Sequence, residues 1–156
     1  MLVYKIPGRE DIIIENIVFD YNGTLAVGGK LIEGVHDLIN ELSKYANIYV
    51  LTADTYGTVV EECKDINCKV LTFPKEKAGQ SKKEIVEKIG GDRTLAVGNG
   101  FNDIPMFEAS ILSIGIIEGE GASGKLLARA DIIVRNIREG INIILNKNMI
   151  KATLRD

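Results

Sequence analysis

Four short segments of the sequence carry side chains that could handle a phosphate group. They are Asp20 with the pair Gly23-Thr24, Thr52 in VLTADT, the lysine pair Lys82-Lys83, and VGNGFND at residues 97–103. A carboxylate can accept a phosphoryl group, and ammonium or hydroxyl groups can neutralise and orient it. Each segment is weak evidence by itself, because acids, threonines and lysines of this kind also cap or solvate helices. Together, and in this order, they predict phosphoryl transfer.

Apolar runs alternate with amphipathic runs from Ile17 onward, and this pattern gives the elements that must position those residues. The predicted strands span residues 17–20, 47–52, 68–73, 94–98, 111–117 and 131–135. The predicted helices span residues 34–45, 55–65, 81–90, 102–110, 122–130 and 136–147, with Ser81 as the N-cap and Gly90 as the end of the third. The alternation predicts an α/β fold: a Rossmann-like, doubly wound, mainly parallel sheet with helices on both faces.

We expect one domain over residues 1–156, because this length suits a single core. Residues 1–16 read as an added β-hairpin at a sheet edge, residues 17–145 as the catalytic core, and residues 146–156 as a polar tail. Ligand sites of doubly wound sheets lie at the carboxyl ends of the strands. Asp20, Thr52 and Asn99 each fall at or just past such an end, so they are expected to converge.

Composition argues against several classes of partner. The formal net charge of -3 disfavours a general nucleic-acid or anionic-membrane surface. The apolar runs are too short to span a bilayer, and the first residues lack the pattern of a signal peptide, so a cytoplasmic location is expected. Cys63 and Cys68 have no matching ligand pair for zinc and are expected to be reduced, and His36 is expected at the surface or its boundary.

The chain resembles the haloacid dehalogenase (HAD) superfamily of phosphohydrolases over about residues 17–145. Within that superfamily, TADT and VGNGFNDIPMFEAS resemble the phosphorylation domain of P-type ATPases, which carry Thr-Gly-Asp and Gly-Asp-Gly-x-Asn-Asp motifs. The match is to the soluble P-type-ATPase-like branch, which has no membrane segments and no nucleotide-binding domain. The segment KKEIVEKI also resembles the lysine motif of small phosphatases such as phosphoserine phosphatase.

The resemblance implies a role for each matching residue. Asp20 would form an aspartyl-phosphate, Thr52 would bind phosphoryl oxygens, and Lys82 would neutralise them, with Lys83 as the alternative. Mg²⁺ would be held by Asp20, the backbone carbonyl of Asn22 and the 99–103 loop. The resemblance thus implies a catalytic set of Asp20, Asn22, Thr52 and Lys82, a substrate-binding set of Gly23, Thr52, Ala53 and Lys82, and a metal set of Asp20, Asn22, Asn99 and Asp103.

Two amides depart from the family pattern. The family usually has aspartate at position 22, where it moves the leaving-group proton, and at position 99, where it binds Mg²⁺. General acid-base help is worth about 10²–10⁴-fold, so Asn22 predicts slow turnover. P-type ATPases also lack that acid, so Asn22 does not prevent phosphorylation of Asp20. Asn99 can still ligate through its amide oxygen but brings no charge, and Asp103, acting through water, is the acid that remains. Asp54 is a further acid nearby, which reads mainly as a helix cap.

Neither gap between these segments is long enough for a cap domain, which many relatives insert. A capless site predicts either a homo-oligomer that covers it or a substrate with an exposed phosphate group; a small phosphorylated substrate is the other expectation, with no nucleic-acid or membrane partner. The leading function is a slow Mg²⁺-dependent phosphatase or phosphotransferase. The alternative is a disabled HAD scaffold that binds phosphate or metal, or regulates. A further hypothesis is deamidation of the Asn-Gly pairs at residues 22 and 99, which would restore the family acids.

Overall fold

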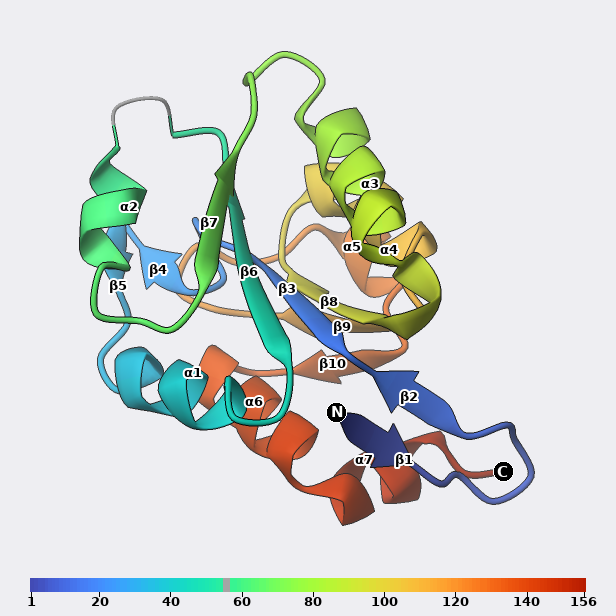
Figure 1. The fold of residues 1–156 in the computed structure, drawn as a ribbon. Coiled ribbons are helices and arrows are strands. Elements are labelled where there is room, and N and C mark those ends of the chain that lie inside the picture. The colour runs from blue at the N-terminus through green and yellow to red at the C-terminus, as the bar shows by residue number, and fades with distance from the viewer. Residues whose placement is uncertain (55–56) are drawn as a thin grey trace.

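A six-stranded parallel sheet lies at the centre of the computed structural model, which describes residues 1–54 and 57–156 (Figure 1). Its strands, in spatial order, are β10 (Ile132–Val134), β9 (Leu112–Ile116), β8 (Thr94–Gly98), β3 (Asn16–Asp20), β6 (Asn47–Thr52) and β7 (Lys69–Thr72). All five pairings are parallel. The chain order reverses between β3 and β8, so the switch point of the sheet, where doubly wound folds bind ligands, lies between these two strands.

Helices cover both faces of the sheet. They are α1 (Val35–Leu42), α2 (Thr58–Glu62), α3 (Ala78–Ile89), α4 (Ile104–Glu108), α5 (Gly124–Leu127), α6 (Ile137–Leu145) and α7 (Lys147–Leu154). Buried residues of α1, α2 and α6 form one core cluster, and those of α3, α4 and α5 form the other. In β3, Ile17 and Phe19 face the first cluster while Val18 faces the second, as the alternation of side chains in a strand requires. The predicted fold class is therefore confirmed.

A small antiparallel pair follows β3 and reaches over the carboxyl edge of the sheet. Its strands are β4 (Ala26–Val27) and β5 (Lys30–Leu31), and the turn between them uses Gly28 and Gly29 at positive φ. The helix α1 comes next, so the segment between Asp20 and Thr52 holds this flap and one helix. Residues 73–77, between β7 and the helix that carries Lys82, hold no further helix or strand. The mouth of the site is therefore framed by the flap and loops of this domain.

The N-terminal hairpin is confirmed, but its predicted place at a sheet edge is wrong. Strands β1 (Leu2–Tyr4) and β2 (Ile12–Ile14) form a separate two-stranded antiparallel sheet that leads into the central strand β3. The polar tail is also more ordered than predicted. Its residues form α7, which buries Ile150 in the first core cluster and packs against β1. The apolar face of α7 is buried against α6 as well as against β1.

Most predicted elements lie where the sequence placed them, with shorter ends. Helix α3 is an exception, because it begins earlier than predicted, at Ala78 rather than at Ser81, which lies inside the helix and donates its N–H to the carbonyl of Lys77. The predicted end at Gly90 is confirmed, with φ at 101°. The first two residues of the predicted helix 55–65 lie outside the described residues. Within residues 1–54 and 57–156, no helix is long and apolar enough to cross a membrane.

Candidate functional site

A buried ion-pair cluster lies at the switch point of the sheet. The ammonium of Lys82 donates to Asp20 Oδ1 at 2.6 Å and to Asp103 Oδ1 at 2.6 Å, and it also reaches Asn102 Oδ1 at 3.3 Å. The lysine side chain is 3% exposed, and those of Asp20 and Asp103 are 12% and 0% exposed. Because the pairs are buried, loss of either partner would leave an uncompensated charge away from water, at a large cost in free energy. The three side chains are therefore expected to stay in contact. Three of the predicted site residues therefore meet.

The structure places Lys82 at the carboxylates and Lys83 outside the site. Lys83 is half-buried, and its ammonium lies 3.7 Å from Glu87 Oε1 one turn along α3. The early start of α3 sets this register, because Lys77 turns the chain at φ 64° and the helix then turns Lys82 inward. The alternative register left open by the sequence is thereby decided.

The electrostatics of Asp20 reflect its burial. Desolvation, followed by the charge of Asp103, raises the pKa of Asp20 to about 7, against the opposing effect of Lys82. Burial acts to lower the pKa of Lys82, but Asp20 and Asp103 together raise it above the usual value for lysine. The cluster has two acids for one base, so a cation or another positive group beside Asp20 would stabilise the ionised carboxylate.

Asp103 holds the loop that follows β8. Its Oδ2 accepts the backbone N–H of Asn99 at 3.1 Å and that of Gly100 at 2.9 Å, while its Oδ1 binds Lys82. Both oxygens of this fully buried carboxylate are therefore engaged. Asp103 ties the loop carrying Asn99 to the lysine that contacts Asp20, and its predicted contribution to a metal site through water stays a prediction.

Gly98 makes room for this carboxylate, and we predict that it does not tolerate alanine. A Cβ at Gly98 would lie 2.5 Å from Asp103 Oδ2 and 2.7 Å from its Cγ. Gly98→Ala is expected to cost about 1–3 kcal/mol of unfolding free energy, as overpacking does. Urea denaturation measures this, with Gly124→Ala as the control, because a Cβ there meets nothing within 4 Å. Equal stability of the two variants would contradict the proposed packing.

Thr24 connects the Asp20 strand end to the 99–103 loop. Its hydroxyl lies 3.4 Å from Asp20 Oδ2 and 3.3 Å from Asn99 Oδ1. Gly23, at φ 82°, lies directly against Asn99, since a Cβ at Gly23 would be 2.2 Å from Asn99 Nδ2. The oxygens of Asp20 and Asn99 thus converge on one hydroxyl group, and only glycine fits between the two segments.

Thr52 and Ala53 follow at the end of the neighbouring strand. In the parallel pairing of β3 with β6, Asp20 is the register partner of Leu51, so Thr52 lies one residue further along the same edge. The hydroxyl oxygen of Thr52 accepts the backbone N–H of Asp54 at 3.1 Å, which leaves its own proton to donate. Asp54 Oδ2 accepts the N–H of Val59 in the first turn of α2 at 2.8 Å. The N-cap position is Gly57, so Asp54 binds this turn from before the helix and the prediction of Asp54 as the N-cap itself is wrong.

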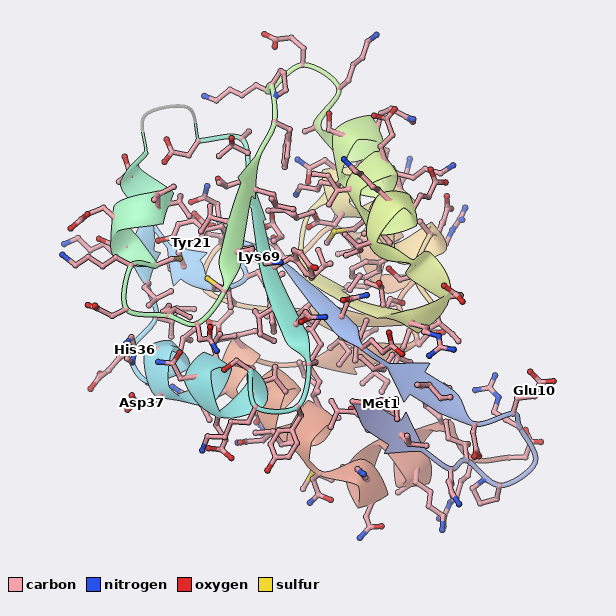
Figure 2. All side chains as sticks on the ribbon, in the orientation of Figure 1. Met1, Glu10, Tyr21, His36, Asp37 and Lys69 are labelled. Atoms are coloured by element: carbon pink, nitrogen blue, oxygen red, sulfur yellow. The ribbon has the colours of Figure 1, made fainter. Side chains whose placement is uncertain are left out.

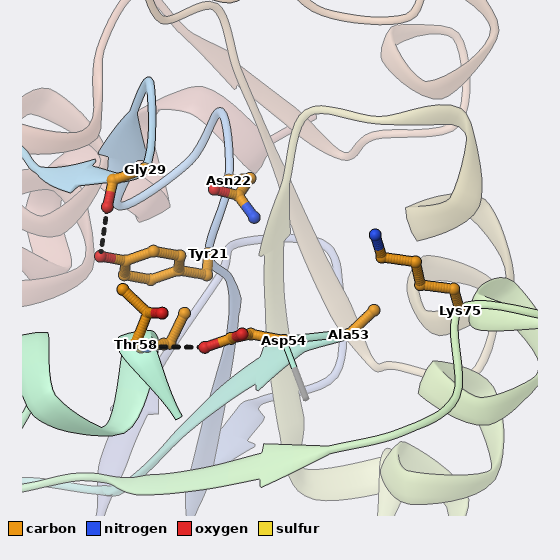
Figure 3. Close-up of a pocket in the computed structure, with 8 residues that line it drawn as sticks. Tyr21, Asn22, Gly29, Ala53, Asp54, Thr58 and Lys75 are labelled. Atoms are coloured by element: carbon orange, nitrogen blue, oxygen red, sulfur yellow. Dashed lines mark hydrogen bonds between the residues drawn. The ribbon is translucent and has the colours of Figure 1, made fainter. Parts of the chain in front are cut away.

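A cavity of 270 Å³ opens beside these residues (Figure 3). Its lining includes Asn22 and Ala53 from two of the predicted segments, with Tyr21, Asp54 and Lys75. Figure 3 shows the side chains of Asn22 and Lys75 extending into this space from different segments. Tyr21 closes the flap side, where its hydroxyl donates to the carbonyl of Gly29 at 3.2 Å. Asn22 is exposed and faces a space next to the Asp20 strand end.

Other candidate residues lie away from this cluster. His36 is partly exposed on α1 and bonds to Asp37, the residue beside it, at 3.0 Å, and Figure 2 labels both on the outer side of that helix. The prediction of a boundary position is confirmed. Cys63 is buried, Cys68 is half-buried, and both are free thiols. Among residues 1–54 and 57–156, no three His, Cys, Asp or Glu side chains gather as a metal site.

Sequence reasoning missed the residues that support the site from outside the four segments. Asn102 is a third contact of Lys82, and the carbonyl of Gly121 accepts from Asn99 Nδ2 at 3.0 Å. Asn102 could have been found, because it lies within VGNGFND. The Gly121 loop follows β9, the strand next to β8, and its Glu-Gly-Glu-Gly composition gave no chemical signal.

No protein-family model matches the chain. The chain is 35% identical over 74 residues to an uncharacterized protein of Methanocaldococcus jannaschii, covering 47% of this chain and 80% of that one. It therefore belongs to the same family as that archaeal protein. A soluble P-type ATPase-like phosphatase of the same organism is 24% identical over 135 residues, which are 85% of this chain and 50% of that protein. The chain thus spans about half the length of that phosphatase.

Solved structures share the fold over most of their length. One, described as a HAD family hydrolase from Streptomyces avermitilis, has a TM-score of 0.71 at 20% identity, over 87% of both chains. The cobalt-bound deoxy-D-mannose-octulosonate 8-phosphate phosphatase of Haemophilus influenzae has a TM-score of 0.71 at 15% identity, over 89% of this chain and 91% of that one.

The corresponding phosphatase of Moraxella catarrhalis, solved with magnesium, phosphate and a KDO molecule, has a TM-score of 0.68 at 15% identity, over 87% and 89% of the two chains. The resemblance to the HAD superfamily is confirmed at the level of the fold.

Proposed function

Because the chain has the fold of the HAD hydrolases, we propose that it is a slow Mg²⁺-dependent phosphatase or phosphotransferase that forms an aspartyl-phosphate on Asp20. One observation carries this proposal: the carboxylate of Asp20, at the carboxyl end of the central strand β3, is held by the buried ammonium of Lys82. The two residues that follow Asp20, Tyr21 and Asn22, line a cavity. This arrangement suits phosphoryl transfer, which depends mainly on positioning and on neutralisation of charge.

The first step would join Asp20 to the phosphorus atom. An oxygen of Asp20 attacks, the bond from phosphorus to the leaving-group oxygen breaks, and that oxygen takes a proton. Lys82 neutralises negative charge on the transferring group, and the hydroxyl of Thr52 donates to a phosphoryl oxygen. Asn22 faces the cavity where the leaving group would sit, but its amide is neither an acid nor a base near neutral pH. Water must therefore supply that proton and later attack the phosphoenzyme without a carboxylate base, which slows both steps.

The residues present could hold a Mg²⁺ ion in a site that contains few negatively charged ligands. Asp20 Oδ2 and Asn99 Oδ1 both lie within hydrogen-bond reach of the Thr24 hydroxyl, so two hard oxygen atoms converge. We propose that these two oxygens and the backbone carbonyl of Asn22 hold the ion, with Asp103 reaching it through water. When bound, Mg²⁺ would neutralise phosphoryl charge as a Lewis acid. A site with a single directly bound carboxylate is expected to bind Mg²⁺ weakly.

The cavity supports a small phosphorylated substrate. Its volume of 270 Å³ is at the lower limit of small-molecule sites, which are about 300–1,000 Å³. Lys75 and Asp54 in its lining offer charged contacts to a polar leaving group. The proposal that another subunit covers this capless mouth remains open to a measurement of oligomeric state.

The second candidate function is a phosphate- or metal-binding protein built on a disabled phosphatase scaffold. The observation that favours it is the pair of amides, since Asn22 and Asn99 stand where the family has acids. The first function and the phosphate-binding form of the second both require phosphate to bind near Asp20, but only the first requires a covalent bond to its carboxylate. Formation of a covalent adduct on Asp20 and hydrolysis of a phosphate ester therefore distinguish the two functions, whereas phosphate binding alone does not.

Asp20→Asn is expected to abolish both turnover and trapping. The measurements are hydrolysis of p-nitrophenyl phosphate or acetyl phosphate with Mg²⁺, and formation of a BeF₃⁻ adduct followed by ¹⁹F NMR. The wild type should show slow hydrolysis and the adduct, and the variant should show neither, because an amide oxygen is not a nucleophile toward phosphorus. Glu87→Gln on the exposed side of α3 is the control. No hydrolysis and no adduct in the wild type would support the binding protein instead.

A further inference from the structure

The side-chain amide of Asn99 has a fixed orientation. Its Nδ2 donates to the carbonyl oxygen of Gly121 at 3.0 Å, and its Oδ1 accepts from the hydroxyl of Thr24 at 3.3 Å. A carbonyl oxygen can only accept, so the group that faces Gly121 must be a donor. This chemistry directs the nitrogen of Asn99 away from Asp20 and its oxygen toward Asp20. An aspartate at position 99 would have no donor for Gly121.

Glu120 adds a negative charge on the same side as that nitrogen. A single Cβ placed on Gly23 would lie 2.2 Å from Asn99 Nδ2 and 2.8 Å from Glu120 Oε2, so both groups flank one point. Glu120 Oε1 also accepts the N–H of Gly28 in the flap at 3.4 Å. The nitrogen of Asn99 therefore faces an environment of a carbonyl and a carboxylate. Both favour a donor at that place and disfavour a second anion.

The loop that supplies this environment is held at both ends. Its N-terminal part is closed by the N–H of Gly121, which donates to the carbonyl of Glu118 at 2.8 Å. Its C-terminal part is fixed by the N–H of Ser123, which donates to the backbone carbonyl of Asn99 at 2.8 Å. Gly121 has φ at 75°, a conformation that glycine adopts without strain. The carbonyl that faces Asn99 is thus positioned by the backbone itself.

We propose that residues 118–123 form a positioning loop, which selects an amide at position 99 and points its oxygen into the Asp20 site. The amide of Asn99 is then the side chain that this loop favours at position 99, and its oxygen is the atom offered to a ligand. The role of the Asn99 oxygen as a ligand rests on the proposed function. The hydrogen bond from Asn99 to Gly121, and its preference for an amide at position 99, do not depend on that function. Asn99→Asp would direct a carboxylate oxygen at the Gly121 carbonyl and bring it next to Glu120.

The same geometry opposes deamidation at this residue. Deamidation needs the backbone nitrogen of Gly100 to attack the side chain of Asn99. The N–H of Gly100 donates instead to Asp103 Oδ2 at 2.9 Å, while the amide of Asn99 is bonded on both sides. The N–H of Gly23, which would attack Asn22, is likewise bonded, to the carbonyl of Ala26 at 2.7 Å. The deamidation hypothesis itself stays a prediction for peptide mass spectrometry.

The first test compares two substitutions with the same change of charge, in Mg²⁺-free buffer. Asn99→Asp is expected to lower the melting temperature by about 3–8 °C, because it leaves a partly buried acceptor opposite another acceptor. Asn22→Asp, at an exposed side chain, should change it by less than about 2 °C. Adding Glu120→Gln to Asn99→Asp should recover part of the loss. A melting temperature of Asn99→Asp equal to that of the wild type would overturn the proposal.

The second test moves the Gly121 carbonyl without touching a site side chain. Gly121→Ala strains a backbone at φ 75°, and Gly34→Ala, at φ 83° in the turn before α1, is the matched control. Gly121→Ala should weaken Mg²⁺ binding in calorimetry about 10–100-fold, the usual effect of losing an outer partner of a ligand. It should also shift the Asn99 side-chain NH₂ signal in ¹⁵N NMR. Gly34→Ala should do neither.

Failure of the inference and failure of the proposed function can be told apart. If the wild type neither binds Mg²⁺ nor hydrolyses phosphate esters, the proposed function fails, while the Mg²⁺-free melting temperatures and the NMR signal still decide the inference. If Gly121→Ala leaves the Asn99 signal and Mg²⁺ binding of an active protein unchanged, the positioning loop is refuted and the function stands.

Discussion

Asn22→Asp is expected to raise the rate of phosphate-ester hydrolysis by about 10²–10⁴-fold, the range that general acid-base catalysis provides. The reason lies in the position of the side chain. Asn22 is exposed, and it lines the cavity beside the strand end that carries Asp20. A carboxyl group there can give a proton to the leaving group and then take one from the attacking water. The amide can do neither.

Steady-state hydrolysis of p-nitrophenyl phosphate measures this gain, and lifetime of the phosphoenzyme after acetyl phosphate labelling measures the second step. Asn22→Ala is the control for removal of the amide without a new acid, and it should show no gain. Asp20→Asn combined with Asn22→Asp should be inactive, because the new acid assists a step that Asp20 begins. If Asn22→Asp hydrolyses no faster than the wild type while BeF₃⁻ still binds, proton transfer does not limit turnover.

Lys82→Met is expected to have the largest effect on stability, about 3–5 kcal/mol of unfolding free energy, as when one member of a buried ion pair is removed. The substitution leaves Asp20 and Asp103 buried beside each other with no base between them. Their side chains are 12% and 0% exposed, so bulk water can stabilise the two charges only weakly once the ammonium is gone. Capture of BeF₃⁻ should also be lost, because the positive group that receives the anion is gone.

Urea denaturation with and without Mg²⁺ measures this loss, and Lys83→Met is the matched control. The Lys83 side chain is 41% exposed and pairs with Glu87 at 3.7 Å, so its substitution should change stability by less than about 1 kcal/mol. Should Lys82→Met fold too poorly for ligand studies, Lys82→Arg keeps the charge and tests the geometry alone. Similar losses in Lys82→Met and Lys83→Met would show that the buried cluster does not stabilise the fold.

The sheet could be predicted because its signals are local. Strands buried on both faces must be apolar throughout, and the strands predicted at residues 47–52 and 94–98 match β6 and β8 from end to end. The predicted positions of Asp20, Thr52 and Asn99 followed, since parallel strands bring their carboxyl ends to one edge. The tail was missed, although Ile150 and Leu154 share a helical face, because that face packs against α6 and the N-terminal strand β1, which only the tertiary structure brings together.

The sequence by itself determined the doubly wound sheet, the edge at which the site lies and the types of side chain that meet there. Periodicity and residue chemistry are properties of short segments, so no distant contact is needed to read them. Only the tertiary structure decided that Lys82 rather than Lys83 binds Asp20, because that choice depends on where the chain turns at Lys77. It alone decided which way the amide of Asn99 points, because the acceptor that fixes it, Gly121, comes from another loop.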